Sequence, residues 1–347
     1  MQTRLIHIIL RWLVVSALFL ATPVCAMDTL RVLAWPGYAD PDVVQAFEQR
    51  YQAQVEVTFV GSDEVLWQQM HAEHGQLFDV VAANSAEMQR YTHEGLLAPL
   101  DLSALPNTGK QLPRFQARAS IPGLIHDGRV YAIPYTYSTM GLIYDRRQFS
   151  QAPQSMSAMW DPRFRQKVLD FNSAEHNFSF TALTLGMRTP FNLSQEQRAR
   201  AQQRLIALRR NVLTYYNLPE EATELFMHHK VALMFGNYGT QQLSLLRRAG
   251  ADVGYVIPKE GALAWLDCWA MTRAARNRGL AQNWINYMLD PWVSGLLTQR
   301  QGLANTLTAS TDLTPNAKII WLEPVVDTAQ REALWQKIIS GDRPGNF

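Results

Sequence analysis

Residues 78–83 read Phe-Asp-Val-Val-Ala-Ala, and this nearly continuous apolar run is typical of a strand that is buried on both faces of a sheet. Two earlier stretches, 30–35 and 55–59, alternate apolar and polar residues and predict two further strands. Between them, Asp40 and Pro41 are suited to the N-cap and the first position of a helix. A strand followed by a helix, repeated, predicts an α/β fold with a mainly parallel sheet and crossover helices.

The rest of the chain continues this alternation with other lengths. Further strands are predicted at 131–135, 141–144, 231–235, 253–257 and 264–271. Further helices are predicted after Ser62, after Ser85 as the N-cap of a short helix that ends at Gly95, after the capping box of Ser194 and Gln197, and at 279–289. A chain of 347 residues is long enough for two domains, and we expect two.

The first 26 residues have the composition of a secretory signal peptide. Arg4 and Arg11 give a positive start, residues 12–21 are apolar, and small residues at 24–26 offer a cleavage site. The apolar run is shorter than the roughly 20 residues that a membrane-spanning helix needs. We therefore expect export, and a soluble periplasmic protein that begins near residue 27.

The charge and the cysteine content exclude several classes of protein. Loss of Arg4 and Arg11 with the signal peptide would leave Lys and Arg equal in number to the 30 Asp and Glu, so no concentrated basic face for nucleic acid is expected. Of the two cysteines, Cys268 alone would remain after cleavage, which excludes an intramolecular disulfide. With no positive neighbour in sequence, Cys268 is expected to be a buried thiol and not a nucleophile.

The positions expected at the carboxyl ends of the strands, where ligands bind in such sheets, carry aromatic and neutral polar residues. They are Trp35-Pro36-Gly37-Tyr38, Asn84-Ser85, 173–177 and Gly236-Asn237-Tyr238. Such groups can surround a small organic ligand. The sequence has no nucleophile elbow, dinucleotide fingerprint or phosphate-binding loop, and no cluster of Cys, His and carboxylates at metal-site spacing. We therefore expect ligand binding without catalysis, cofactor or metal.

One stretch carries a resemblance to a known family. Residues 258–267, Pro-Lys-Glu-Gly-Ala-Leu-Ala-Trp-Leu-Asp, resemble the second crossover of the periplasmic spermidine/putrescine-binding proteins. In that family an aromatic residue and an aspartate two positions later face the ligand, and Trp265 and Asp267 match that pair. Residues i and i+2 of a strand lie on one face, which explains their common direction. The likeness continues in order along the chain at 33–38, 78–81, 133–135 and 284–291.

The resemblance implies two α/β lobes, joined by crossover strands, that close over a ligand in the cleft between them. It implies lobe 1 at 27–135 and 265–310, and lobe 2 at 136–264 and 311–347. It also implies delivery of a polyamine, such as putrescine or spermidine, to a membrane ABC importer by a chain that we expect to be a monomer and not an enzyme. The alternative is a ligand-sensing partner of a membrane signalling protein.

The site that the resemblance implies combines a carboxylate with aromatic walls. Asp267 would pair with one ammonium, and the rings of Trp35, Tyr38 and Trp265 would cover the methylenes and attract the cations. The full set of expected ligand-binding residues is Trp35, Tyr38, Asn84, Ser85, Glu175, His176, Asn237, Tyr238, Trp265 and Asp267.

The chain departs from the family where the family supplies further acids. Ser173 and His176 stand at positions of acidic residues, with Glu175 one residue out of register. After the strand at 231–235, where a Trp and, in the putrescine branch, an Asp are usual, the chain has Gly236-Asn237-Tyr238-Gly239. At least two carboxylates are therefore expected to be missing, which would leave one ammonium poorly paired. Three explanations stay open. Glu175 replaces the lost acid; or the ligand has one amine and a different far end, with His176 as a neutral or pH-tuned partner; or the protein is a sensor with weak polyamine affinity.

Overall fold

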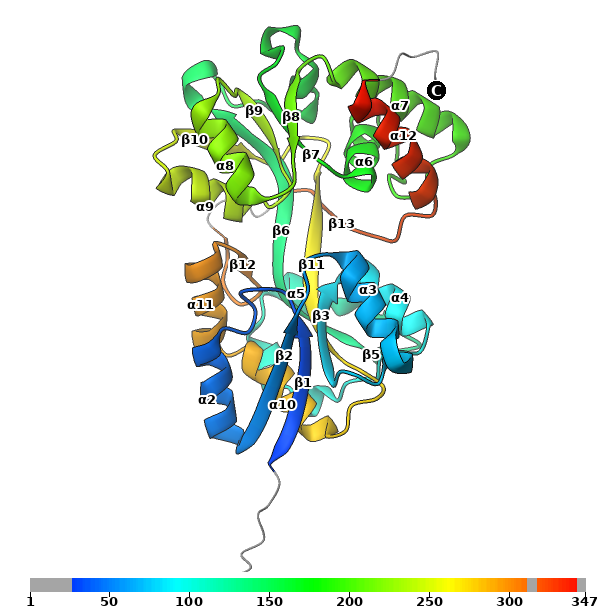
Figure 1. Cartoon of the computed structure of the whole chain (residues 1–347), viewed down its shortest axis with the longest axis vertical. Helices are drawn as coiled ribbons and strands as arrows, with labels where there is room; N and C mark the ends of the chain where they lie inside the picture. Colours follow the sequence, from blue (N-terminus) through cyan, green and yellow to red (C-terminus); the bar gives the residue numbers. More distant parts are fainter. Residues whose placement is uncertain (1–26, 311–316, 342–347) are drawn as a thin grey trace, which may run out of the picture.

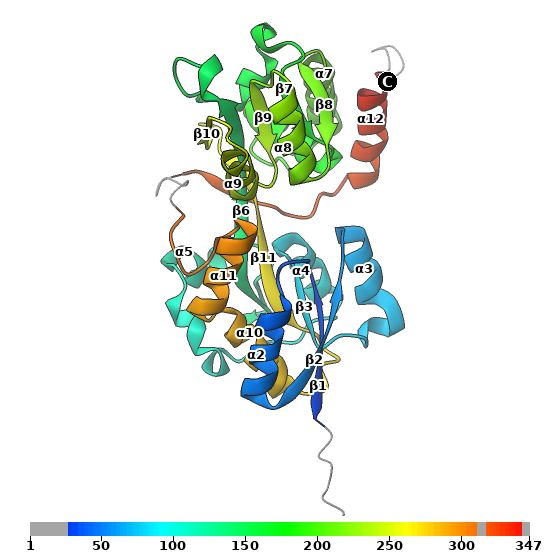
Figure 2. The same cartoon turned by 60° about the vertical axis from the view of Figure 1, so that its left-hand side comes forward.

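The structure, a computed structural model, describes residues 27–310 and 317–341, so the predicted signal peptide lies outside the described residues. Two lobes lie one above the other and are joined by two long strands, β6 (Ala132–Asp145) and β11 (Ala262–Met271) (Figure 1, Figure 2). The predicted two-lobed α/β fold is confirmed. Within the described ranges, no helix is long and apolar enough to cross a bilayer.

One sheet runs through both lobes in the order β2-β1-β3-β11-β6-β9-β7-β8. Its lobe 1 strands are β1 (Asp28–Ala34), β2 (Ala53–Phe59) and β3 (Val80–Asn84). Its lobe 2 strands are β7 (Val168–Phe171), β8 (Val212–Tyr216) and β9 (Leu233–Gly236). β1 is parallel to both its neighbours, and so is β7. The antiparallel pair β6 and β11 lies between these two parallel blocks and joins them.

Short strands complete the sheet in lobe 2 and at the junction of the lobes. They are β10 (Val253–Val256) and β12 (Ala304–Asn305), which pair with β6, and β13 (Ile319–Trp321), which pairs with β11. Strands β4 (Ile125–His126) and β5 (Arg129–Val130) form a separate hairpin. The chain therefore crosses between the lobes a third time, near β13 (Figure 1).

The prediction of two strands at 131–135 and 141–144 is wrong, because β6 is one continuous strand of 14 residues. The polar residues at its middle, Thr136 and Ser138, are buried and hydrogen-bonded. The hydroxyl of Thr136 donates to the carbonyl of Ala304 at 2.7 Å, and that of Ser138 donates to the carbonyl of Tyr238 at 3.1 Å. These bonds tie the centre of the strand to its neighbours.

Helices cover both faces of the sheet in each lobe. Those of lobe 1 are α2 (Pro41–Tyr51), α3 (Asp63–His71), α4 (Ser85–His93), the short α5 (Pro113–Gln116), α10 (Arg278–Met288) and α11 (Pro291–Gln301). Those of lobe 2 are α6 (Ala174–Thr184), α7 (Gln195–Leu208), α8 (Pro219–His228), α9 (Thr240–Arg248) and α12 (Thr328–Ser340).

The helix starts follow the predicted caps with one exception. Ser62 accepts a hydrogen bond from the Val65 amide, and Ser194 and Gln197 form the predicted capping box. The N-cap of α4, however, is Asn84 and not Ser85. Because β3 continues through Asn84, that residue keeps an extended backbone, and its Oδ1 accepts from the Glu87 amide at 3.0 Å.

The C-terminal helix α12 is fastened to lobe 2 by a buried arginine. The guanidinium of Arg331 has no solvent exposure and donates to Asp327, to the Ser179 hydroxyl and to the Pro190 carbonyl at 2.7–3.1 Å. Asp327 also accepts from Arg198 at 2.7 Å, so the buried arginine is part of a small polar network that joins α12 to α6 and α7. The expected lobe boundaries at 135/136 and 264/265 fall inside β6 and β11, and the third, at 310/311, borders residues outside the described ranges; all three stay a prediction.

Candidate ligand-binding site

A cavity of about 720 Å³, which we call the main cavity, opens between the two lobes at the ends of their strands. Its lining includes nine of the ten residues expected from the sequence: Trp35, Tyr38, Asn84, Glu175, His176, Asn237, Tyr238, Trp265 and Asp267. Ser85 is the exception. It is fully buried, and its hydroxyl donates to the carbonyl of Leu322 at 3.4 Å. Because β3 continues to Asn84, Ser85 is already the first residue of α4, and its buried side chain does not line the cavity.

The carboxylate of Asp267 is held by a tyrosine from the first strand. The Tyr38 hydroxyl donates to Asp267 Oδ2 at 2.5 Å, and both side chains are buried. Burial raises the pKa of Asp267 to about 7, against the lowering effect of the Tyr38 hydrogen bond and with a further rise from the negative charge of Asp63. A buried carboxylate has lost most of its hydration, so contact with a cation stabilises its charged form strongly.

A break in the strand pairing sets this geometry. Asp267 lies opposite Thr136, but the next residue, Cys268, lies opposite Pro134, so Tyr135 is an extra residue in β6. Such a bulge re-aims side chains. The ring of Tyr135 meets that of Tyr38 edge-on at 5.4 Å between centroids, which supports the tyrosine that bonds Asp267. Cys268 is a fully buried thiol, as the sequence predicted.

Lobe 2 contributes a chain of polar contacts around Trp265. Its indole Nε1 donates to the Asn237 carbonyl at 3.3 Å, and the Asn237 side-chain oxygen accepts from His176 Nδ1 at 2.8 Å. Burial lowers the pKa of His176, although the charge of Glu175 and the bond to Asn237 act in the opposite direction. The imidazole is therefore neutral at pH 7 and forms a polar part of the wall of the main cavity.

The remaining walls are aromatic. The ring of Phe171, at the end of β7, stacks on His176 at 5.9 Å and meets Tyr238 edge-on at 5.7 Å. Phe171 was missed by the sequence analysis, although it ends β7 as Asn84 ends β3. The indole Nε1 of Trp35 is buried and has no hydrogen-bond partner among the described residues, which leaves a donor at the cavity wall.

Two acids that the sequence analysis did not single out also line the main cavity, namely Asp63 and Glu332. Asp63 is the first residue of α3, and its Oδ1 accepts from the Asn84 amide group at 3.1 Å. Asp63 is exposed within the cleft, and the partial loss of its hydration there raises its pKa to about 6, with a further rise from the charges of Glu87 and Glu175. The cavity therefore holds acids beyond Glu175 and Asp267, and these come from helices α3 and α12.

The sequence profile of the bacterial extracellular solute-binding proteins matches residues 42–319. The chain belongs to this family. The predicted resemblance to its spermidine/putrescine-binding branch is also confirmed, and the family is one of transport-related binding proteins rather than of enzymes. Solute-binding proteins of this kind act outside the cytoplasm, in agreement with the name of the family.

Individual relatives match this solute-binding protein over nearly its whole length. The putrescine-binding periplasmic protein PotF of Escherichia coli is 26% identical, over 94% of this chain and 95% of its own. The spermidine/putrescine-binding periplasmic protein 1 of Haemophilus influenzae is 24% identical, over 88% of this chain and 87% of its own. The solved structure of the spermidine/putrescine substrate-binding protein PotD of Streptococcus pneumoniae has a TM-score of 0.75 at 18% identity, over 91% of this chain and 100% of its own, which shows a common fold.

Proposed function

We propose that this solute-binding protein captures a polyamine, or a similar small organic cation, in the main cavity and delivers it to an ABC importer. The names of the relatives support this class of ligand. We further propose that the chain is exported to the periplasm by the signal peptide at 1–26 and that it works as a monomer.

One observation carries the choice of ligand. Among the described residues, four carboxylates line the main cavity, those of Asp63, Glu175, Asp267 and Glu332, and no Lys or Arg does. Carboxylates without cationic partners attract a positively charged guest and repel an anionic one. A polyamine supplies the missing charges as ammonium groups.

The aromatic walls suit the rest of such a ligand. A polyamine is a chain of methylenes between ammonium groups, and the faces of Trp35 and Trp265 would cover the methylenes and attract the charges, at about 0.5–2 kcal/mol per contact. Asp267, with its Tyr38 partner, would bind one ammonium directly through a charge-assisted hydrogen bond.

The same lining argues against a ligand with a carboxylate at its far end. A basic amino acid would place that carboxylate beside acids, and the one basic side chain among the described lining residues is His176, whose pKa is lowered by burial. Of the three explanations left open by the sequence, the replacement of lost acids is therefore favoured, with Glu175 joined by Asp63 and Glu332.

Isothermal titration calorimetry with a small panel of ligands tests this proposal. Putrescine, spermidine and agmatine are the amines, arginine carries an added carboxylate, and 1,4-butanediol is the uncharged control that matches putrescine in length. We expect saturable heat with at least one amine, and none with butanediol. X-ray scattering of the same samples should show a smaller radius of gyration with the ligand that binds. Absence of heat with every amine would overturn the proposal.

A further inference from the structure

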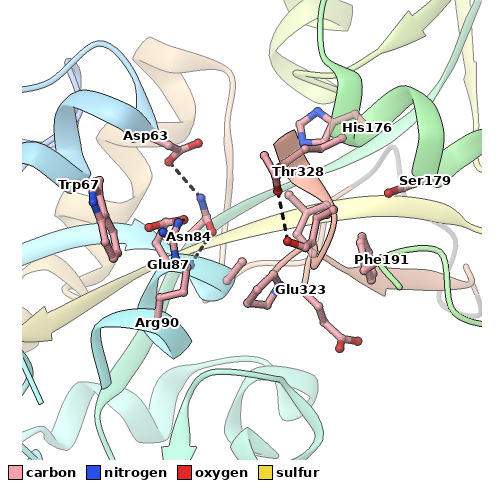
Figure 3. Close-up of a pocket in the computed structure, with 15 residues that line it drawn as sticks. Asp63, Trp67, Asn84, Glu87, Arg90, His176, Ser179, Phe191, Glu323 and Thr328 are labelled. Atoms are coloured by element: carbon pink, nitrogen blue, oxygen red, sulfur yellow. Dashed lines mark hydrogen bonds and ion pairs between the residues drawn. The ribbon is translucent and has the colours of Figure 1, made fainter. Parts of the chain in front are cut away.

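A second hollow of about 530 Å³, which we call the side cavity, adjoins the main cavity. The two share lining residues from both lobes: Asp63, Asn84, Glu175, His176, Leu322 and Thr328. Figure 3 shows Asp63 and Asn84 on one side of the side cavity and His176 and Thr328 on the other. The cleft is therefore longer than the main cavity alone, and Asp63 lies where its two parts meet.

The side cavity is itself acidic. Its lining adds Glu87 and Glu323, against Arg90 as the one Lys or Arg there among the described residues. Arg90 is already occupied, because it donates to Glu87 Oε1 at 2.9 Å and lies over the ring of Trp67 at 3.9 Å. One arginine cannot neutralise the acids around it.

Glu87 offers an unused acceptor in this wall. The residue is 8% exposed, and its second oxygen, Oε2, makes no hydrogen bond of good geometry among the described residues. Burial raises the pKa of Glu87, and the nearby Tyr91 hydroxyl offsets this only in part. A buried carboxylate oxygen without a partner costs free energy, unless a ligand supplies a donor. A protonated amine that entered the side cavity would supply both the hydrogen bond and the charge.

The carboxylate of Asp63 interacts electrostatically with acids in both parts of the cleft. Its charge acts on Asp267 in the main cavity, while the charges of Glu87 and Glu175 act on Asp63 from the other side. Asp63 starts α3 in lobe 1 and Glu175 lies on α6 in lobe 2. An ammonium group between them would be attracted by both lobes and would favour their closure.

We propose that Asp63 is a second ammonium anchor, and that the ligand is an extended polyamine of three or more charged amines that reaches from Asp267 past Asp63 into the side cavity towards Glu87. The inference rests on the proposed function and names its substrate more narrowly.

Calorimetry with amines of increasing charge tests the inference. Butylamine, putrescine and spermidine carry one, two and three amines. For Asp63→Asn we expect the affinity for spermidine and putrescine to fall at least tenfold, and that for butylamine to change less than twofold. For Glu87→Gln we expect a loss of at least fivefold with spermidine and little change with putrescine. The control is Glu56→Gln, which removes one exposed negative charge from β2 of the same lobe and should leave all three affinities unchanged.

The outcomes separate this inference from the proposed function. If the wild-type protein binds none of the amines, the proposed function itself fails. If it binds them but Asp63→Asn behaves like Glu56→Gln, the anchor is refuted and the polyamine proposal stands. If it binds spermidine no more tightly than putrescine and Glu87→Gln changes neither, the extended ligand is refuted. Circular dichroism checks folding, and Asp63→Ser, which keeps a good residue for a helix start, is the second variant should Asp63→Asn misfold.

Discussion

The Tyr38 hydroxyl donates a 2.5 Å hydrogen bond to Asp267 Oδ2, across 229 residues of sequence. Tyr38 follows β1, whereas Asp267 lies on the crossing strand β11. The bond stabilises the charged carboxylate, but burial disfavours it more strongly, and the pKa of Asp267 rises to about 7. The Tyr38 bond therefore fixes the position of the Asp267 carboxyl, and a bound cation would favour its deprotonated form.

The first prediction concerns the stability of the ligand-free protein. The raised pKa of Asp267 means that the native state holds its proton more tightly than the unfolded chain, so the free energy of unfolding falls as the pH rises from about 4 to about 7. Asp267→Asn removes this cost. We expect the variant to melt about 2–5 °C higher than the wild type at pH 8, with a smaller difference at pH 5. A difference that does not change with pH would show that titration of Asp267 is not its cause.

The second prediction concerns the pH dependence of amine binding. Binding needs charged acids, and the raised pKa values of Asp267, about 7, and Asp63, about 6, mean that both are partly protonated in mildly acidic solution. We expect the affinity for spermidine to fall at least tenfold between pH 8 and pH 5.5, with release of protons on binding. Calorimetry in buffers of different ionisation enthalpy measures that release. Equal affinity across this range would contradict the prediction.

The third prediction concerns Trp265. Its ring lines the main cavity and its Nε1 donates to the Asn237 carbonyl. Trp265→Ala removes both ring packing and cation–π attraction, and should weaken amine binding by more than about 1 kcal/mol. Trp265→Phe keeps an aromatic face, and its affinity for amines should lie between those of the wild type and of Trp265→Ala. Trp292→Ala is the matched control, because Trp292 is 50% exposed on α11 and should not alter binding. Unchanged amine affinity in Trp265→Ala would show that the ring does not contribute to ligand binding.

The fourth prediction concerns a carboxyl outside the site. Asp170 on β7 is fully buried; its Oδ1 accepts from the Phe171 amide at 2.8 Å, and Oδ2 has no hydrogen-bond partner among the described residues. Burial raises the pKa of Asp170 to about 8, so stability should fall as the pH rises from about 4 to about 8. We expect Asp170→Asn to gain stability relative to the wild type as the pH is raised from 5 to 8. Urea unfolding at both pH values measures this. A constant difference would refute it.

Local signals were sufficient for much of the fold. Some features depend only on residues that are close in sequence, so pattern and spacing reveal them. Examples are the apolar run before Asn84, the capping residues Ser62 and Ser194, and the pair Trp265 and Asp267. The continuity of β6 was not visible, because its buried hydroxyls are satisfied by partners far along the chain, such as the Ala304 carbonyl bonded by Thr136.

The site was less predictable than the fold, for the same reason. Asp63 and Glu332 are unremarkable helix residues in sequence, and they become part of the cavity because α3 and α12 approach it from opposite lobes. Ser85 shows the opposite error: it is adjacent to a site residue, but a one-residue difference in the helix start directs it into the protein.

The most direct test of cation binding by Asp267 is calorimetric titration of spermidine into the wild-type protein and into Asp267→Asn at pH 7.5. Removal of a buried charge that pairs with a cation should cost about 3–5 kcal/mol. We predict saturable binding to the wild type and an affinity at least 100-fold lower for the variant, with its fold retained. Equal affinity of the two proteins for spermidine would contradict the central claim that Asp267 holds the cation between the lobes.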